Sequence, residues 1–145
     1  MAVNKKGKYW YGEKQDDIAH EIRRYSKSGY PALHYANARC RCGHAIFRLS
    51  LDDDQGAAVR TCDHCGREHA IGDSAEYLAE AQLQTCACPC GEERLEITVG
   101  IAPYDDGQAV RWLYVGCRCP QCGLVAVYGD WKNEFEDYQG LLANV

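Results

Sequence analysis

The sequence has no long apolar run, and its lysine-containing start has no apolar core. No segment of the 145 residues approaches the ~20 consecutive apolar residues of a membrane-spanning helix. Residues 1–11 contain lysines but lack the apolar stretch of a secretion signal. We therefore expect a protein without a membrane partner, located in the reducing cytoplasm.

Motifs of the common catalytic classes are also missing. The sequence shows no nucleophile–base arrangement, no phosphate-binding loop and no metal motif with an open fourth position. The aspartates at 52–54 and 105–106 lie in segments typical of hairpin turns, where solvated side chains are expected. The sequence therefore predicts a protein that is not an enzyme.

Cysteine, by contrast, is abundant, with ten residues in the chain. Eight of them form four close pairs, each followed by glycine, and the pairs group into two quartets. The quartets are Cys40, Cys42, Cys62 and Cys65, and then Cys88, Cys90, Cys119 and Cys122. Six residues past each quartet the copies match again, at 71–73 (Ile-Gly-Asp) and 128–130 (Tyr-Gly-Asp). The chain therefore contains one internal repeat of a cysteine-based unit.

Pairs of this kind indicate metal-binding knuckles more than the long-range disulfides of a secreted scaffold. Zinc accepts four sulfurs tetrahedrally at ~2.3 Å, and glycine after the second cysteine permits the positive φ of a tight knuckle. We predict two closed four-cysteine sites, with all eight cysteines as ligands and two zinc ions per chain. Units near 50 residues rarely fold alone without such support.

The Cys-x-x-Cys-Gly sequences at Cys62 and Cys119 resemble the knuckles of zinc-ribbon and rubredoxin-like modules. The resemblance covers roughly residues 40–72 and 88–129 and implies β-hairpin units built around a metal. The pairs at Cys40 and Cys88 are one residue shorter than the usual form, which counts against rubredoxin-type iron.

Two cysteines, Cys86 and Cys117, fall outside the quartets, each two residues before a ligand pair. Three interpretations are open: buried thiols that pack as small hydrophobes, a redox-sensitive pair, and alternative ligands. Histidines are not expected to bind the metal. His64 lies inside a knuckle and should face outward, while His44 and His69 have no counterpart in the second copy.

Hydrophobic periodicity predicts an α+β fold of two zinc-ribbon-like hairpin units with short helices, packed as one body, plus an N-terminal helix. The helix is predicted over residues 13–28, hairpins over 45–61 and 95–114, and further strands over 68–71 and 124–128. Asp73 with Glu76 forms a capping box that predicts a helix to about Leu83, and Asp130 is expected to cap a final helix. Residues 9–11 are either a frayed arm or a first strand.

Three segments follow from this pattern. Residues 1–39 form the arm and helix, residues 40–84 the first repeat, and residues 85–145 the second. The link between the repeats is too short for a flexible tether, so the units should pack together.

Charge points to the class of partner. Residues 1–39 hold eight Lys/Arg against four Asp/Glu, whereas residues 40–145 hold eight against seventeen, a balance of −9. Four thiolates around Zn²⁺ would add about −2 at each site. Such a body repels phosphate backbones, so we expect no duplex nucleic acid and instead a basic protein partner.

The stretch 128–132, followed by Leu141, Leu142 and Val145, resembles the tails of some bacterial immunity proteins. This resemblance implies a small protein-binding inhibitor of a basic toxin. Two alternatives remain: a nucleic-acid-associated zinc ribbon of transcription or translation that uses the basic arm, and a redox protein that uses iron or the Cys86/Cys117 pair. Aromatic groups at 9–11 and at Trp112, Tyr114 and Tyr128 suit a core, a protein interface or base stacking.

Overall fold

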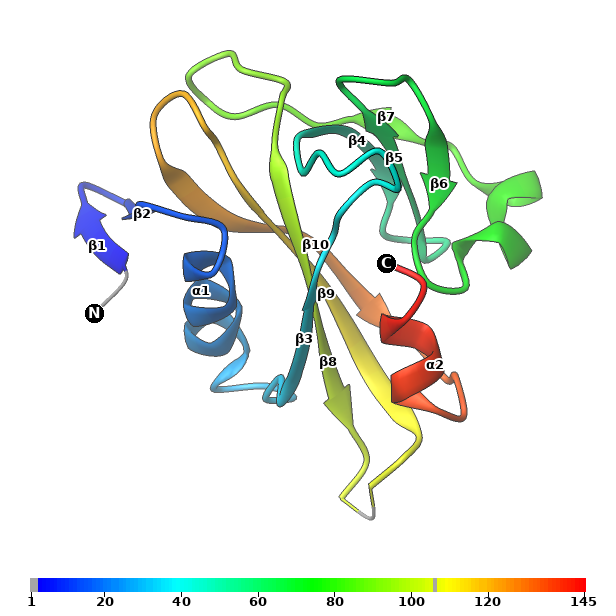
Figure 1. The fold of residues 1–145 in the computed structure, drawn as a ribbon. Helices are drawn as coiled ribbons and strands as arrows, with labels where there is room; N and C mark the ends of the chain where they lie inside the picture. The colour runs from blue at the N-terminus through cyan, green and yellow to red at the C-terminus, as the bar shows by residue number, and fades with distance from the viewer. Residues whose placement is uncertain (1–2, 106) are drawn as a thin grey trace.

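Two antiparallel β-sheets make up most of the fold (Figure 1). The computed structural model describes residues 3–105 and 107–145. The larger sheet has the order β1-β2-β10-β9-β8-β3 and the smaller one β6-β5-β4-β7. The strands of the larger sheet are β1 (Val3–Lys6), β2 (Tyr9–Gly12), β3 (His34–Asn37), β8 (Glu96–Pro103), β9 (Val110–Arg118) and β10 (Leu124–Lys132). Those of the smaller sheet are β4 (Phe47–Asp52), β5 (Ala57–Cys62), β6 (Glu68–Ala70) and β7 (Gln84–Thr85).

Strands from the first 39 residues lie on both sides of the β8–β9–β10 meander. On one side β2 pairs with β10, where Tyr11 lies opposite Leu124; on the other, β3 pairs with β8. Residues 9–11 are thus part of a strand, one of the two predicted alternatives. The N-terminal segment completes the sheet that carries the second quartet.

Helix α1 (Asp17–Ser26) covers one face of the larger sheet. Ile18 and Ile22 are fully buried there, over glycines of β8 and β9. A Cβ at Gly116 would lie 2.7 Å from Ile18 Cγ2, so the helix can approach the sheet only because this position lacks a side chain. The helix predicted over residues 13–28 is present but shorter, at Asp17–Ser26. Its start is delayed because the Asp17 carboxylate accepts the backbone N–H groups of residues 13 and 14, which holds them in a turn.

The opposite face of the larger sheet packs against the smaller sheet and helix α2 (Tyr138–Leu142). Phe47 and Leu49 of β4 share one buried cluster with Ile97 and Val99 of β8. Phe47 and Leu95 also exchange two backbone hydrogen bonds of 2.8 Å, which tie β4 to the residue just before β8. The segments that carry the two quartets therefore share one core.

The predicted hairpins and third strands are present in both copies, as β4–β5–β6 and β8–β9–β10. Alternation of apolar residues gave the correct faces in β8, where Ile97, Val99 and Ile101 point toward the shared core. Neither described α-helix, nor any other helix in residues 3–105 and 107–145, is long and apolar enough to cross a membrane.

The helix predicted after Asp73 is wrong. The segment forms two 3₁₀ turns, η1 (Ser74–Glu76) and η2 (Leu78–Glu80), and Asp73 makes no capping hydrogen bond. Its carboxylate instead accepts a hydrogen bond from Asn133 Nδ2 at 3.1 Å. A long-range hydrogen bond thus replaces the local cap.

The helix start predicted at Asp130 is also wrong. Strand β10 continues past it to Lys132 after a bulge between Val127 and Gly129. The Asp130 carboxylate accepts a hydrogen bond from Trp112 Nε1 at 2.9 Å, on the neighbouring strand. The final helix is capped by Asp137, which accepts the Gln139 backbone N–H at 3.1 Å.

Candidate metal centres

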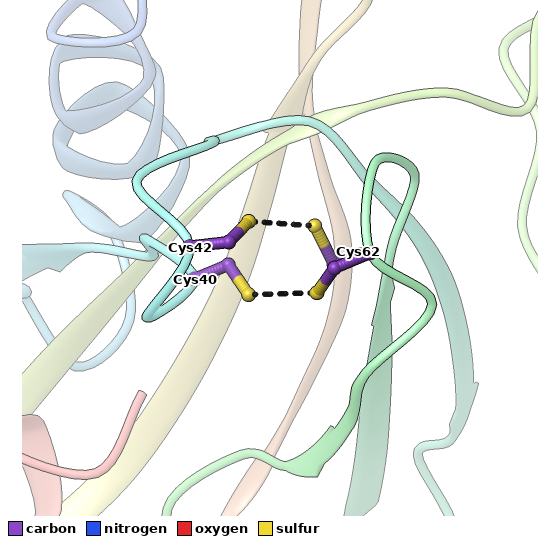
Figure 2. Close-up of side chains that lie close together, drawn as sticks. Cys40, Cys42 and Cys62 are labelled. Carbon is purple, nitrogen blue, oxygen red and sulfur yellow. Dashed lines mark hydrogen bonds between the residues drawn. The ribbon is translucent and has the colours of Figure 1, made fainter.

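The first quartet gathers at the end of the β4–β5 hairpin. Cys40 and Cys42 come from the loop before β4, Cys62 ends β5, and Cys65 lies in the turn to β6. The Sγ atoms of Cys40 and Cys65 are 3.5 Å apart, and those of Cys42 and Cys62 are 3.6 Å apart. Cys40, Cys42 and Cys62 face one another in Figure 2.

The second quartet repeats this arrangement at the end of the β8–β9 hairpin. The Sγ atoms of Cys88 and Cys122 are 3.6 Å apart, as are those of Cys90 and Cys119. Within each quartet all four sulfurs lie within 4.8 Å of one another. Sulfurs bound tetrahedrally at ~2.3 Å would lie about 3.8 Å apart, so both groups fit a four-sulfur metal site. The structure thus brings together all eight predicted ligands.

Backbone hydrogen bonds shape the knuckles. In the first copy the N–H of Gly43 donates to the carbonyl of Cys40 at 2.9 Å; the N–H of Gly91 does the same for Cys88 at 2.8 Å. Both glycines have positive φ, at 95° and 100°, a region that other residues enter at a cost. The glycine after each cysteine pair is therefore a requirement of the turn, as the sequence predicted.

Burial follows the same order in both quartets. The first and third cysteines, Cys40 and Cys62 or Cys88 and Cys119, are at most 4 % exposed and belong to the shared core. The second and fourth are exposed. Each site thus has two sulfurs anchored in the core and two at the surface.

Backbone N–H groups favour thiolates in these knuckles. The N–H of Cys42 points at the Cys40 sulfur and lowers the pKa of that thiol to about 6. The N–H of Glu92 likewise lowers the pKa of Cys90. Because the thiolate is the form that binds metal, each quartet holds at least one sulfur prepared for a cation.

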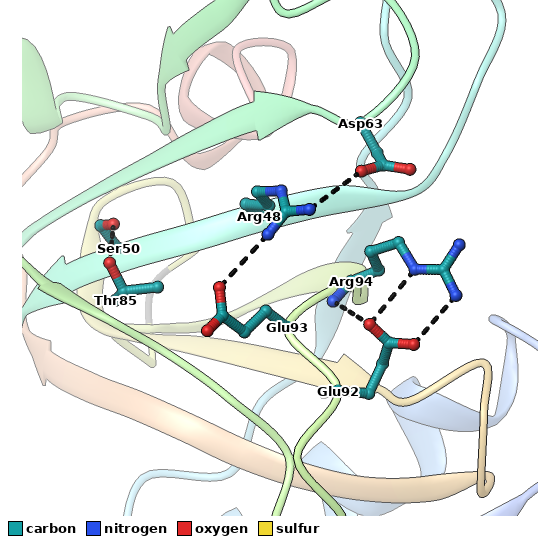
Figure 3. A network of polar contacts seen from close by, with 7 residues as sticks. All are labelled: Arg48, Ser50, Asp63, Thr85, Glu92, Glu93 and Arg94. Carbon is teal, nitrogen blue, oxygen red and sulfur yellow. Dashed lines mark hydrogen bonds and ion pairs between the residues drawn. The ribbon is translucent and has the colours of Figure 1, made fainter.

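A surface ion-pair network links the two centres (Figure 3). Arg48 of β4 contacts Asp63, inside a knuckle of the first quartet, at 3.6 Å. It also contacts Glu93, just past a knuckle of the second, at 3.2 Å. The sequence missed this link because only the folded register places Arg48 between the quartets. These side chains are one third to one half exposed, so the network contributes little free energy.

Histidines lie around the first centre but not within the quartet. His44 stacks on His64 with ring centroids 3.8 Å apart, and its Nδ1 lies 3.4 Å from the sulfur of Cys42. His69 Nε2 lies 2.8 Å from the carbonyl of Asn144. The contact of His44 with a ligand sulfur was not predicted, because the second copy has glutamate at 92 in that place.

Neither Cys86 nor Cys117 belongs to the quartets. Cys117 is fully buried, Cys86 is half-buried, and both pack with the shared core. Burial raises the pKa of Cys86 to about 11 and that of Cys117 well above its usual value. The raised pKa values disfavour the thiolate form that binds metal, and the packing agrees with the hydrophobic interpretation; the redox pair stays a prediction.

The turn aspartates 52–54 form a third cluster of possible ligand atoms. Both Asp52 oxygens already accept backbone N–H groups, Oδ1 from Asp54 at 3.0 Å and Oδ2 from Gln82 at 2.9 Å. The N–H of Gln82 is the main cause of the lowered pKa of Asp52. This carboxylate caps its turn and ties it to the segment before β7.

Comparison with protein-family models, with curated proteins and with solved structures gives no match for this chain. The residues of the chain themselves define a mostly β protein with two four-cysteine groups that are compatible with metal ions. The resemblances to zinc ribbons and to immunity proteins remain predictions.

Proposed function

We propose that this is a non-enzymatic binding protein in which a structural zinc ion closes the end of each of two hairpins, β4–β5 and β8–β9. The observation that carries the proposal is the pair of four-sulfur groups at the hairpin ends. Four thiolates fill the tetrahedral coordination of zinc and leave no position for water or substrate. Two core cysteines in each group couple the metal to packing. Zinc in such a site supports the fold and does no chemistry.

Elemental analysis tests this part of the proposal. Protein purified without added metal should contain two zinc ions per chain and should be colourless. A chelator should remove the zinc and unfold the protein, because structural zinc contributes on the order of 10–16 kcal/mol of apparent binding energy. One ion per chain, or stoichiometric iron with a red colour, would contradict it.

An exposed aromatic patch supports a protein partner. The patch comprises Tyr30, Tyr104, Arg111 and Trp112. The Arg111 guanidinium lies 4.0 Å from the Tyr30 ring centroid, and Tyr30 lies 5.2 Å from Trp112. Both tyrosines remain 37 % exposed. Tyr, Trp and Arg are the residues that dominate binding hot spots, and here they form one preorganised group.

The excess of acidic residues supports a basic partner, drawn in by long-range attraction and held at the aromatic patch. One concrete form is an immunity-type protein that masks a basic toxin. Attraction of this kind speeds association, and its contribution falls as salt rises.

A matched set of variants tests the binding role. Wild-type protein, the double variant Tyr30→Ala/Tyr104→Ala, and Tyr77→Ala are compared in capture from native extract. Tyr77 is 44 % exposed and lies outside the patch, which makes it the control. The double variant should lose the partner, because a loss of about 2 kcal/mol of binding free energy weakens the affinity roughly 30-fold. The control should keep the partner. Equal capture by all three proteins would reject the patch as the interface.

A further inference from the structure

The two four-cysteine centres share one backbone frame. In each copy the N–H of the first cysteine donates at 2.8 Å to the carbonyl of the residue two places past the second cysteine, from Cys40 to His44 and from Cys88 to Glu92. The sulfur pairs also agree, at 3.5 and 3.6 Å in the first centre and at 3.6 Å for both pairs in the second. A chemical difference between the centres therefore comes from the side chains around them.

The side chain at this matched position differs between the copies. The backbone N–H of the residue points at the sulfur of Cys42 in the first copy and of Cys90 in the second, and we call these two the outer sulfurs. In the first copy His44 adds a second contact, since its Nδ1 lies 3.4 Å from the sulfur of Cys42. A metal-bound thiolate carries no proton, so Nδ1–H is the donor in that contact.

The second copy has no counterpart to this donor. The ionised carboxylate of Glu92 has no proton to donate, and it accepts a hydrogen bond from Arg94 Nη2 at 2.9 Å. Among residues 3–105 and 107–145, the hydrogen bonds between side chains that reach the sulfur of Cys90 come from cysteine alone. A side-chain N–H thus supports the outer sulfur of the first centre and not that of the second.

We propose that His44 is a positioning residue that holds the outer sulfur of Cys42 on the metal, so that the first centre exchanges its metal more slowly than the second. The inference rests on the part of the proposed function that assigns a metal ion to each centre. It adds that the two ions are not equivalent, and that the second centre is the place where a competing thiol-seeking metal ion enters.

The imidazole of His44 is held in place from two sides. Its backbone carbonyl accepts the N–H of Cys40, and its ring stacks on that of His64 with centroids 3.8 Å apart and planes 15° apart. His64 lies in the other knuckle of the same centre, between two of its cysteines, where the second copy has Gln121. A donor that is already oriented loses little conformational entropy when it bonds to the sulfur.

The outer sulfur is the place where such a contact affects exchange. Cys42 and Cys90 are exposed, whereas the first and third sulfurs of each quartet are buried, so an incoming metal ion meets the exposed sulfurs first. A hydrogen bond to a thiolate draws charge from the sulfur, which makes it a weaker nucleophile toward that ion, and also fixes its orientation. Loss of partners of this kind typically costs about 10–100-fold in metal affinity.

Replacement of zinc by cadmium tests the difference without emptying either site, because four thiolates hold both ions tetrahedrally. The zinc-loaded full chain is mixed with one equivalent of the NMR-active cadmium isotope, and correlation of each cadmium signal with cysteine Hβ protons assigns it to a quartet. The signal of the second centre should appear at least about tenfold faster than that of the first. Equal rates, or faster entry at the first centre, would overturn the proposal.

Matched variants isolate the contact of His44. His44→Leu removes the donor and should speed exchange at the first centre about tenfold, with the second centre unchanged. His44→Asn keeps an N–H in the same place and should restore slow exchange. The control is His69→Leu, because His69 Nε2 lies 2.8 Å from the carbonyl of Asn144 and not against a sulfur. Slow exchange in His44→Leu, or equal acceleration in His69→Leu, would reject the role of this contact.

The same spectra separate this inference from the proposed function. Fully exchanged protein should show two cadmium signals, each correlated with four cysteines. Fewer than two signals would refute the assignment of a metal ion to each centre and this inference with it. Two signals that grow at the same rate would leave both metal centres in place and refute only their inequality.

Discussion

Replacement of Cys122 by serine separates a metal ligand from an ordinary surface cysteine. Cys122 is exposed, and its sulfur lies 3.6 Å from that of Cys88. Without a metal, an exposed substitution of this size should change the free energy of unfolding by less than about 0.5 kcal/mol. With a structural zinc worth about 10–16 kcal/mol shared over four ligands, the loss should be about 2.5–4 kcal/mol. The loss of unfolding free energy expected with a bound zinc is thus several times the loss expected without one.

Urea unfolding followed by tryptophan fluorescence measures the difference. The control is Gln121→Ser, an exposed change in the same knuckle that leaves all four sulfurs in place. Because both quartets share one core, the Cys122→Ser loss should appear in a single transition of the whole molecule. In excess chelator neither variant should show a cooperative urea transition, because loss of zinc unfolds both. If Cys122→Ser matches Gln121→Ser within about 0.5 kcal/mol before chelation, the structural-metal reasoning is refuted.

Three further predictions concern the core, the spare cysteines and nucleic acid. Gly116→Ala should destabilise the protein by about 1–3 kcal/mol in urea melts, because its Cβ would meet Ile18 and Ile22; a stability equal to wild type would contradict the close helix–sheet approach. Cys86→Ala combined with Cys117→Ala should retain two zinc ions by elemental analysis, and loss of one ion would make these cysteines ligands. Duplex DNA should show no binding in fluorescence anisotropy at about 0.15 M salt. Submicromolar binding there would favour the nucleic-acid alternative.

Local pattern was sufficient for the parts of the fold that depend on near neighbours. The hairpins follow from alternating apolar residues, as at Ile97, Val99 and Ile101, which face the core. The two quartets follow from cysteine spacing and from the glycine that each knuckle requires. In these segments the residues that decide the structure lie close together in the sequence.

Pairing between distant residues explains the failures. The local sequence predicts Asp130 as a helix cap, but its carboxylate accepts a hydrogen bond from the indole N–H of Trp112 on the adjacent strand. Asp73 reads as part of a capping box, but it accepts a hydrogen bond from Asn133 instead. Arg60 stands where the second copy has Cys117. Its Nε donates to a main-chain oxygen of Val145 at 2.7 Å, a contact that local sequence could not indicate.

The strand order also dictates when each part can form as the chain leaves the ribosome. All four ligands of the first centre lie between residues 40 and 65, so this site can close early, around a metal and a nearby hairpin. Strand β2 must instead wait for β10, since Tyr11 pairs with Leu124. Until then its edge and the apolar side of α1 lack their partners, a state prone to association with other chains. Early metal binding would therefore fold the first hairpin unit of the nascent chain, and the larger sheet would assemble last.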